Sequence, residues 1–141
     1  MIKNTWRVIL LVTLSCLCIV SLISCGEGIN GEEAKAFIND FFAAIVAEDY
    51  EKAESFLHPE RPADLDSFLP DIEKNEGLDF QAGIEIERFT GFSSSLYDST
   101  VNGSTYELRM RTRVGEANVI FTIEIVKNEN GYGIYNLNID T

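Results

Sequence analysis

The chain has 141 residues, of which 11 are Lys or Arg and 23 are Asp or Glu, so its formal net charge is −12. A chain of this length makes about one domain with a core of its own. Its strong negative charge argues against nucleic acid and anionic lipid surfaces as partners, and leaves cations, basic peptides and small neutral ligands.

The first 24 residues have the composition of a secretory leader. Lys3 and Arg7 make a basic start without an acid, and an apolar run over residues 8–22 follows. A basic start, a short apolar run and a small residue at its end are typical of a signal peptide. The alternative is a membrane-spanning anchor, because residues 8–24 just reach the lower limit of about 17 residues for a transmembrane helix.

The leader ends in Leu22-Ile23-Ser24-Cys25, which resembles the lipobox of bacterial lipoproteins. The resemblance implies cleavage between Ser24 and Cys25 and a diacylglycerol with further fatty acyl groups on Cys25. Residues 1–24 would then be a removed signal peptide, residues 25–31 the lipidated cysteine and a tether, and residues 32–141 a single α+β domain. The acyl chains would hold the domain on the extracytoplasmic side of the cell membrane or outer membrane.

Loss of the leader changes the composition of what remains. Of the 141 residues 117 are left, with nine basic and 23 acidic residues and a net charge of −14. Cys16 and Cys18 leave with the leader and Cys25 is acylated, so no thiol is left for a disulfide or a metal. We expect neither a metal nor a cofactor.

Helical signals come first in the mature part. Asn30 is a good N-cap, with Glu33 three residues later as in a capping box. A stripe at helical spacing follows: Ala34, Phe37, Ile38, Phe41, Phe42, Ile45 and Val46. Asp49 restarts a shorter helix that His58-Pro59 ends. Residues 63–75 predict further helical turns, with a kink or break at Pro70.

From residue 84 the apolar period changes to two, which is typical of antiparallel strands with one covered face. The inward set comprises Tyr106, Leu108, Met110, Thr112, Val114, Val119, Phe121, Ile123, Ile125, Tyr135, Leu137 and Ile139. The first strand, residues 84–96, loses its alternation near Glu87-Arg88 and Gly91, which indicates a bulge or bend.

Two turns predict the strand register. A two-residue turn at Gly115-Glu116 places Met110 opposite Phe121 and Leu108 opposite Ile123. A three-residue loop at Glu129-Asn130-Gly131 places Ile123 opposite Leu137 and Ile125 opposite Tyr135.

The predicted fold is therefore α+β: a long N-terminal helix and shorter helices packed on a curved, four-stranded antiparallel sheet. This layout, with Asp49-Tyr50-Glu51-Lys52-Ala53 and Leu57-His58-Pro59, resembles the nuclear transport factor 2-like superfamily, and within it small bacterial lipoproteins with cystatin-like folds. The resemblance covers residues 32–140. It implies a cone with a cavity, which in some relatives is an isomerase or cyclase site and in many others a non-catalytic binding site.

The expected pocket lies between the first helix and the sheet, lined by Phe41, Ile45, Met110 and Phe121. No acid stands among the inward strand positions, so we expect a non-catalytic module that binds a small apolar ligand or an envelope protein. The alternatives are an isomerase-like or cyclase-like enzyme, which needs a carboxylate and a tyrosine in that cavity, and a dimerising interaction domain. The dimer would use the outer sheet face through Ile120 and Val126.

Three further groups of residues have simpler interpretations. His58, the only histidine, is expected to close the second helix by local hydrogen bonds, with an acid–base or ligand role as the alternative. Arg109, Arg111 and Arg113 are expected to form an outward, ion-paired row rather than an anion site, with Glu124 diagonal to Arg109. The acids between Asp64 and Asp79 lack the spacing of a calcium-binding EF-hand loop.

Overall fold

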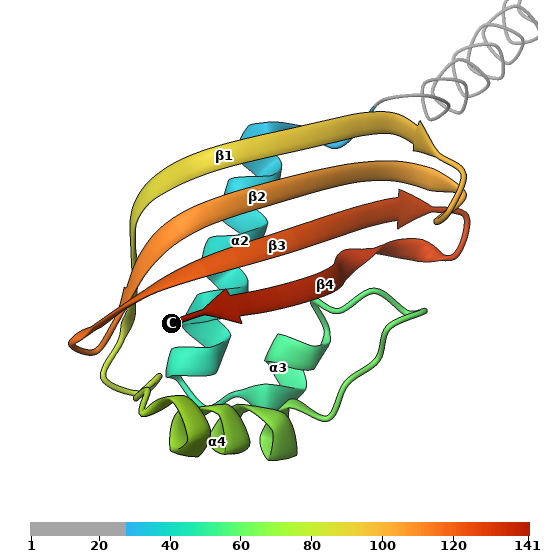
Figure 1. Cartoon of the computed structure of the whole chain (residues 1–141). Helices are drawn as coiled ribbons and strands as arrows, with labels where there is room; N and C mark the ends of the chain where they lie inside the picture. The colour runs from blue at the N-terminus through green and yellow to red at the C-terminus, as the bar shows by residue number, and fades with distance from the viewer. Residues whose placement is uncertain (1–27) are drawn as a thin grey trace, which may run out of the picture.

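The computed structural model describes residues 28–141, so the leader and Cys25 lie outside the described residues. The described elements are α2 (Gly31–Val46), α3 (Tyr50–Glu54), α4 (Leu65–Glu76), β1 (Ile84–Asp98), β2 (Gly103–Val114), β3 (Ala117–Asn128) and β4 (Gly131–Asp140). The strands form one antiparallel sheet in the order β1-β2-β3-β4. The α+β class is confirmed. Figure 1 shows α2 crossing one face of a curved sheet, with α3 and α4 below its far end.

Helix α2 begins where the capping signal predicts. The Asn30 side chain accepts hydrogen bonds from the backbone N–H groups of Glu32 and Glu33 at 2.9 and 3.3 Å. These bonds satisfy two of the donors that a helix start leaves open, and the acidic side chains in this turn suit the helix dipole. The face toward the sheet is fully apolar, and its buried residues are Ala34, Ile38, Phe41, Phe42, Ala44 and Ile45.

Helix α3 begins at its predicted cap, because the Asp49 side chain accepts a hydrogen bond from the N–H of Lys52 at 3.2 Å. Helix α4 does not break at Pro70, so the break that was one of the two expected outcomes was wrong: the helix continues from Leu65 to Glu76. Pro70 and Asp66 are both exposed. The carbonyl group of Asp66, which loses its helical partner at a proline, can therefore bond to water. Leu65 and Leu69 on the opposite side are buried, and this burial holds the helix in place.

The register between β2 and β3 is the predicted one. Met110 lies opposite Phe121, Leu108 opposite Ile123, and Val114 opposite Ala117 across the two-residue turn. Gly115 begins that turn with φ at +57°, a conformation that glycine adopts without steric cost.

The register between β3 and β4 was predicted correctly at Ile123 and Leu137 but not at Ile125. The turn holds two residues instead of three, since Asn128 pairs with Gly131, and this places Ile125 opposite Ile134. The extra residue Tyr135 then restores the predicted register at Ile123. Ile134 also forms two backbone hydrogen bonds of 2.8 Å with Phe56 and His58, in the segment after α3, along the free edge of β4.

Strand β1 carries the predicted irregularities. Its pairing with β2 skips one residue at Glu87 and another at Thr90. Each skipped residue is a β-bulge, which bends the strand and re-aims the side chains that follow. The second half of β1 is consequently exposed on both faces, whereas the inner faces of β2 and β3 are buried.

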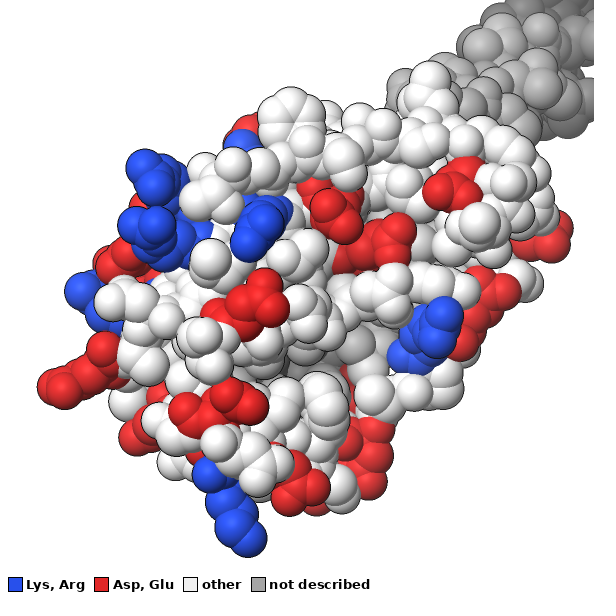
Figure 2. Space-filling model, in the orientation of Figure 1, with Lys and Arg blue, Asp and Glu red and all other residues white. Residues whose placement is uncertain are grey.

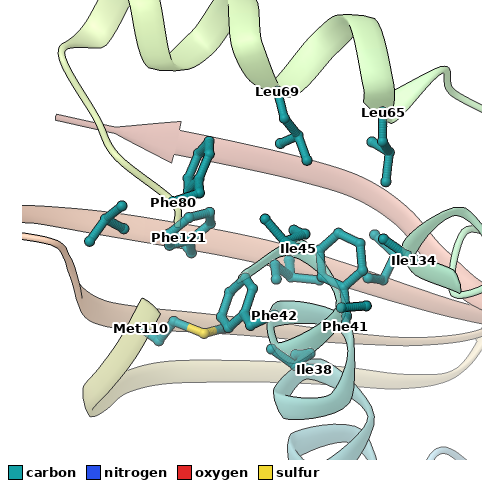
Figure 3. Packing of buried hydrophobic residues seen from close by; sticks show 14 of the residues in the cluster. Ile38, Phe41, Phe42, Ile45, Leu65, Leu69, Phe80, Met110, Phe121 and Ile134 are labelled. Carbon is teal, nitrogen blue, oxygen red and sulfur yellow. The ribbon is translucent and has the colours of Figure 1, made fainter. Parts of the chain in front are cut away.

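The core lies between α2, α4 and the inner face of the sheet (Figure 3). Phe42 from α2 and Phe121 from β3 have ring centroids 4.9 Å apart, and the ring of Phe121 is 1% exposed. In Figure 3, Leu65 and Leu69 point from α4 toward this cluster. One continuous apolar core therefore joins the helices to the sheet.

Replacing Phe121 by Ala is expected to lower the free energy of unfolding by about 3–5 kcal/mol, because it removes a buried ring and leaves a cavity. The matched control is Phe68→Ala on α4, where the side chain is 46% exposed and the loss should stay under about 1 kcal/mol. Urea unfolding followed by circular dichroism measures both. Equal losses in the two variants would contradict the assigned core.

Candidate functional site

The four residues expected to line a pocket are part of the packed core. Phe41 and Met110 are 0% exposed, Phe121 is 1% and Ile45 is 2% exposed. None of the four lines any of the four most prominent hollows of the described residues. The interior between α2 and the middle of the sheet is thus occupied by side chains, and the open space lies at its margins.

A groove with mainly apolar walls lies between α2 and the bulged half of β1. Its volume is about 680 Å³, within the range of small-molecule sites. The groove is lined by Lys35, Phe89, Thr90, Gly91, Phe92, Tyr106 and Leu108. Phe92 and Tyr106 stack with ring centroids 6.4 Å apart and planes inclined by 13°. We call this feature the α2–β1 groove.

The α2–β1 groove has one charged side chain. The Lys35 ammonium lies 5.2 Å from the centroid of the Phe89 ring and 2.7 Å from Glu32 Oε1. The hydrogen bond to Glu32 raises the pKa of Lys35 above its usual value of 10.5, so this cation persists at neutral pH. The groove can therefore hold an apolar body against Phe89 and Leu108, with a polar or anionic group near Lys35.

A polar cluster, here named the His58 network, comprises His58, Glu60, Asn128 and Asn130. The N–H of Glu60 donates to His58 Nδ1 at 3.2 Å, so in the neutral ring Nε2 carries the proton and donates to Asn128 Oδ1, also at 3.2 Å. The Asn128 amide donates to Glu60 Oε2 at 2.8 Å and to the carbonyl of Val101 at 2.9 Å. Asn130 donates to the other Glu60 oxygen at 2.8 Å.

This network joins the segment after α3 to the turn between β3 and β4. His58 is 0% exposed and both of its ring nitrogens have protein partners, so a substrate has no access to it. The geometry is that of a structural histidine that fixes a loop. The hydrogen bond with the backbone of Glu60 is local, as expected, whereas Asn128 could not be named as a partner from spacing because it is 70 residues away.

The arginine row on β2 points outward, with Arg109, Arg111 and Arg113 all exposed. Arg113 pairs with Glu85 and lies 3.9 Å from Glu87. Glu124 accepts a hydrogen bond from Asn136, so its partner among the described residues is not Arg109. A second hollow of about 550 Å³ on this face is lined by both charge signs, including Glu87, Arg111 and Asp140. In Figure 2, most Lys and Arg side chains of this view gather at the left end of the molecule.

The expected apolar patch of Ile120 and Val126 on the outer sheet face is not present as such. Ile120 is partly buried and Val126 is 0% exposed. Val126 lies opposite Gly133, and opposed residues point to the same face. A Cβ on Gly133 would lie 2.6 Å from the backbone nitrogen of His58. The segment after α3 therefore crosses the outer face here and covers Val126.

Few side chains in the described part of the chain are placed to act as a general acid or base. The buried polar side chains there are His58 and Thr112, and no described carboxylate is buried. The Thr112 hydroxyl has no hydrogen-bond partner, and its neighbours across the strands are Ile86 and Val119. Residues 28–141 contain no group of three or more potential metal ligands, and no helix among them is long and apolar enough to span a membrane.

Comparisons with protein-family models, with curated protein sequences and with solved structures found no match for this chain. The predicted cleavage at Ser24 and lipidation at Cys25 lie outside the described residues.

The groove-lining residues Lys35, Phe89, Phe92 and Tyr106 were not predicted as a site. The sequence did contain one indication of this site. The loss of alternation in β1 indicated that some of its side chains change the face to which they point. That signal gave the position of the irregularity. It could not give the partner surface, since Lys35 comes from a helix 54 positions before Phe89 and is brought there by packing.

The His58 network predicts a pH dependence of stability. Hydrogen bonds from Asn128 first, and then Asn130, lower the pKa of Glu60 below its usual value of 4.5. The charged Glu60 thus stabilises the fold above that pH, and the contribution is lost as pH falls through the lowered value. Glu60→Gln should lower the urea midpoint near neutral pH, and the difference from wild type should shrink well below pH 4.5.

The control for this experiment is Glu129→Gln in the same turn, where the structure gives no hydrogen bond to the side chain. Its urea midpoint should follow wild type at both pH values. A Glu60→Gln difference that is equally large in acid and at neutral pH would contradict the assigned role of the Glu60 charge.

Proposed function

We propose that this chain is a lipid-anchored protein of the cell envelope, with a nuclear transport factor 2-like or cystatin-like domain that binds a small apolar ligand without catalysis. The observation that carries the ligand-binding part is the α2–β1 groove. The motif Leu22-Ile23-Ser24-Cys25 carries the anchoring part. A helix laid across a curved, four-stranded antiparallel meander supports the proposed fold family.

The chemistry of the groove suggests the class of ligand. Phe89, Phe92, Tyr106 and Leu108 offer apolar and aromatic surface, and Lys35 offers one cation at the margin. A ligand with an apolar body and a single anionic or polar group matches this distribution. The absence of any carboxylate among the seven lining residues supports a non-catalytic role, because proton abstraction needs a base within hydrogen-bond reach.

Lipidation is tested first by the cysteine that the motif singles out. When the full chain is expressed in bacteria with a labelled fatty acid, Cys25→Ser is expected to stay uncleaved and unlabelled. Cys18→Ser, inside the apolar run, is the matched control and should be processed and labelled like wild type. Labelling of the Cys25→Ser protein would rule out the proposed anchor.

Ligand binding is tested by native mass spectrometry of residues 26–141, purified gently without the lipid. We expect a discrete extra mass on the wild-type protein that is lost on denaturation. Phe89→Ser removes an apolar wall and Lys35→Gln removes the cation, so both should reduce the occupied fraction. Phe68→Ser on α4 is the matched control. It replaces a half-exposed Phe that does not line the groove, so this variant should retain the extra mass.

Other outcomes of this measurement point to the alternative functions. A bare wild-type monomer would contradict ligand binding and favour an envelope protein as partner. A bare dimer would favour the dimerising interaction domain. A bound molecule that is released chemically altered would favour the enzyme, with Tyr106 as the nearest candidate acid.

A further inference from the structure

Three of the exposed large apolar side chains lie close together in the sequence at the end of β1. Phe92 and Leu96 are each 75% exposed and Tyr97 is 64% exposed. We call these three residues the β1 patch. The other large apolar residues exposed in the described chain, Phe68 and Tyr132, belong to α4 and β4. Three of the five large apolar side chains exposed in the described chain are thus concentrated within six residues at one end of β1.

The β1 patch lies where the described chain begins. A Cβ added to Gly28 would lie only 2.6 Å from Leu96 Cδ2, so the backbone at residue 28 rests directly against the patch. At the first residue of α2 the chain is still in this region, because a Cβ on Gly31 would overlap the hydroxyl of Tyr106, which stacks on Phe92. In Figure 1, the described chain likewise begins beside the arrowhead half of β1 and runs from there to the start of α2.

Covalent geometry limits how far Cys25 can be from this patch. Gly28 is three positions after Cys25, and a chain spans at most about 3.6 Å per position, so the distance between the two residues is at most about 11 Å. Because an acylated Cys25 sits at the bilayer surface, its attachment brings the patch to the bilayer. We propose that the β1 patch inserts into the interfacial region of the membrane and fixes the orientation of the domain on it. This proposal rests on the proposed lipid anchor.

The chemistry of the patch suits lipid. Phe92 and Leu96 provide apolar surface, and Tyr97 is an amphipathic ring whose hydroxyl donates to Asn102 Oδ1 at 2.8 Å. Aromatic residues of this kind are favoured where an apolar phase meets water. Between residues 89 and 101 the only charged residue is Asp98, and there is no Lys or Arg. The patch should consequently enter neutral lipid by burial of apolar surface and gain nothing from anionic headgroups.

A second copy of the chain fits this surface less well. Strand β1 is the edge strand of the described sheet, but the bulges at Glu87 and Thr90 interrupt its backbone as a template for pairing. Phe92 also points to the inner side, since it lies opposite Leu108, whose side chain is buried in the core. The α2–β1 groove shares Phe92 with the patch, so a ligand leaving the groove would do so next to the bilayer.

The test places a tryptophan in the patch of the processed, lipidated protein. Trp6 is the only tryptophan of the chain and is removed with the leader, so the introduced tryptophan is the only one in the protein that is measured. The reporter variant is Leu96→Trp, and the matched control is Phe68→Trp on α4. Each protein is reconstituted into phosphatidylcholine vesicles with or without bromine on the acyl chains. Insertion predicts that brominated lipid reduces the Leu96→Trp emission at least roughly two-fold, while Phe68→Trp is unchanged.

Vesicle flotation separates failure of the anchor from failure of the patch. Protein that floats with the vesicles but keeps full Leu96→Trp emission would overturn the membrane contact and leave the anchor intact. Emission shifted to shorter wavelength without quenching would mean that a second copy covers Leu96, and this too would overturn the proposal. Protein that does not float at all would overturn the anchor and, with it, the inference.

Discussion

Burial of the apolar stripe of α2 against the concave face of the sheet is the constraint on which the rest of the structure depends. Phe41, Phe42 and Ile45 occupy the centre of the curve, and Phe121 and Met110 meet them from β3 and β2. Because these side chains fill the middle, interior space for a ligand is left only at the margins of the helix–sheet contact. The packing that stabilises the domain thus also decides where a binding site can lie.

The bulges of β1 determine what that margin looks like. A regular edge strand would keep its apolar side chains on the inner face and its backbone available for pairing with another chain. The extra residues at Glu87 and Thr90, and a third register shift between Ser95 and Asp98, make β1 irregular; Phe92 and Leu96 are exposed on this part of the strand, and Phe92 lines the groove with Lys35 and Phe89. One irregular strand therefore supplies both the proposed ligand site and the proposed contact with the bilayer.

The buried polar groups have a different role. His58 is fully enclosed, yet its two nitrogens bond to Asn128 and to the backbone of Glu60, so its burial costs little. The same network pulls the segment after α3 over β4, where it covers Val126 and closes the edge of the sheet at Ile134. Buried polar residues in this domain serve to place a loop. The most exposed large apolar side chains of the described chain lie elsewhere, on β1.

The sequence by itself determined the local features: the cap at Asn30, the stripe of α2, the hairpin register of β2 with β3, and the approximate positions of the β1 bulges. Each depends on neighbours within a few residues, where propensity and period decide the outcome. Only the tertiary structure decided that α4 continues through Pro70, that Val126 is covered, and that Lys35 and Phe89 share a groove. These features depend on which distant segment supplies a hydrogen bond or a covering surface. Periodicity carries no information about such partners, because it describes one element at a time.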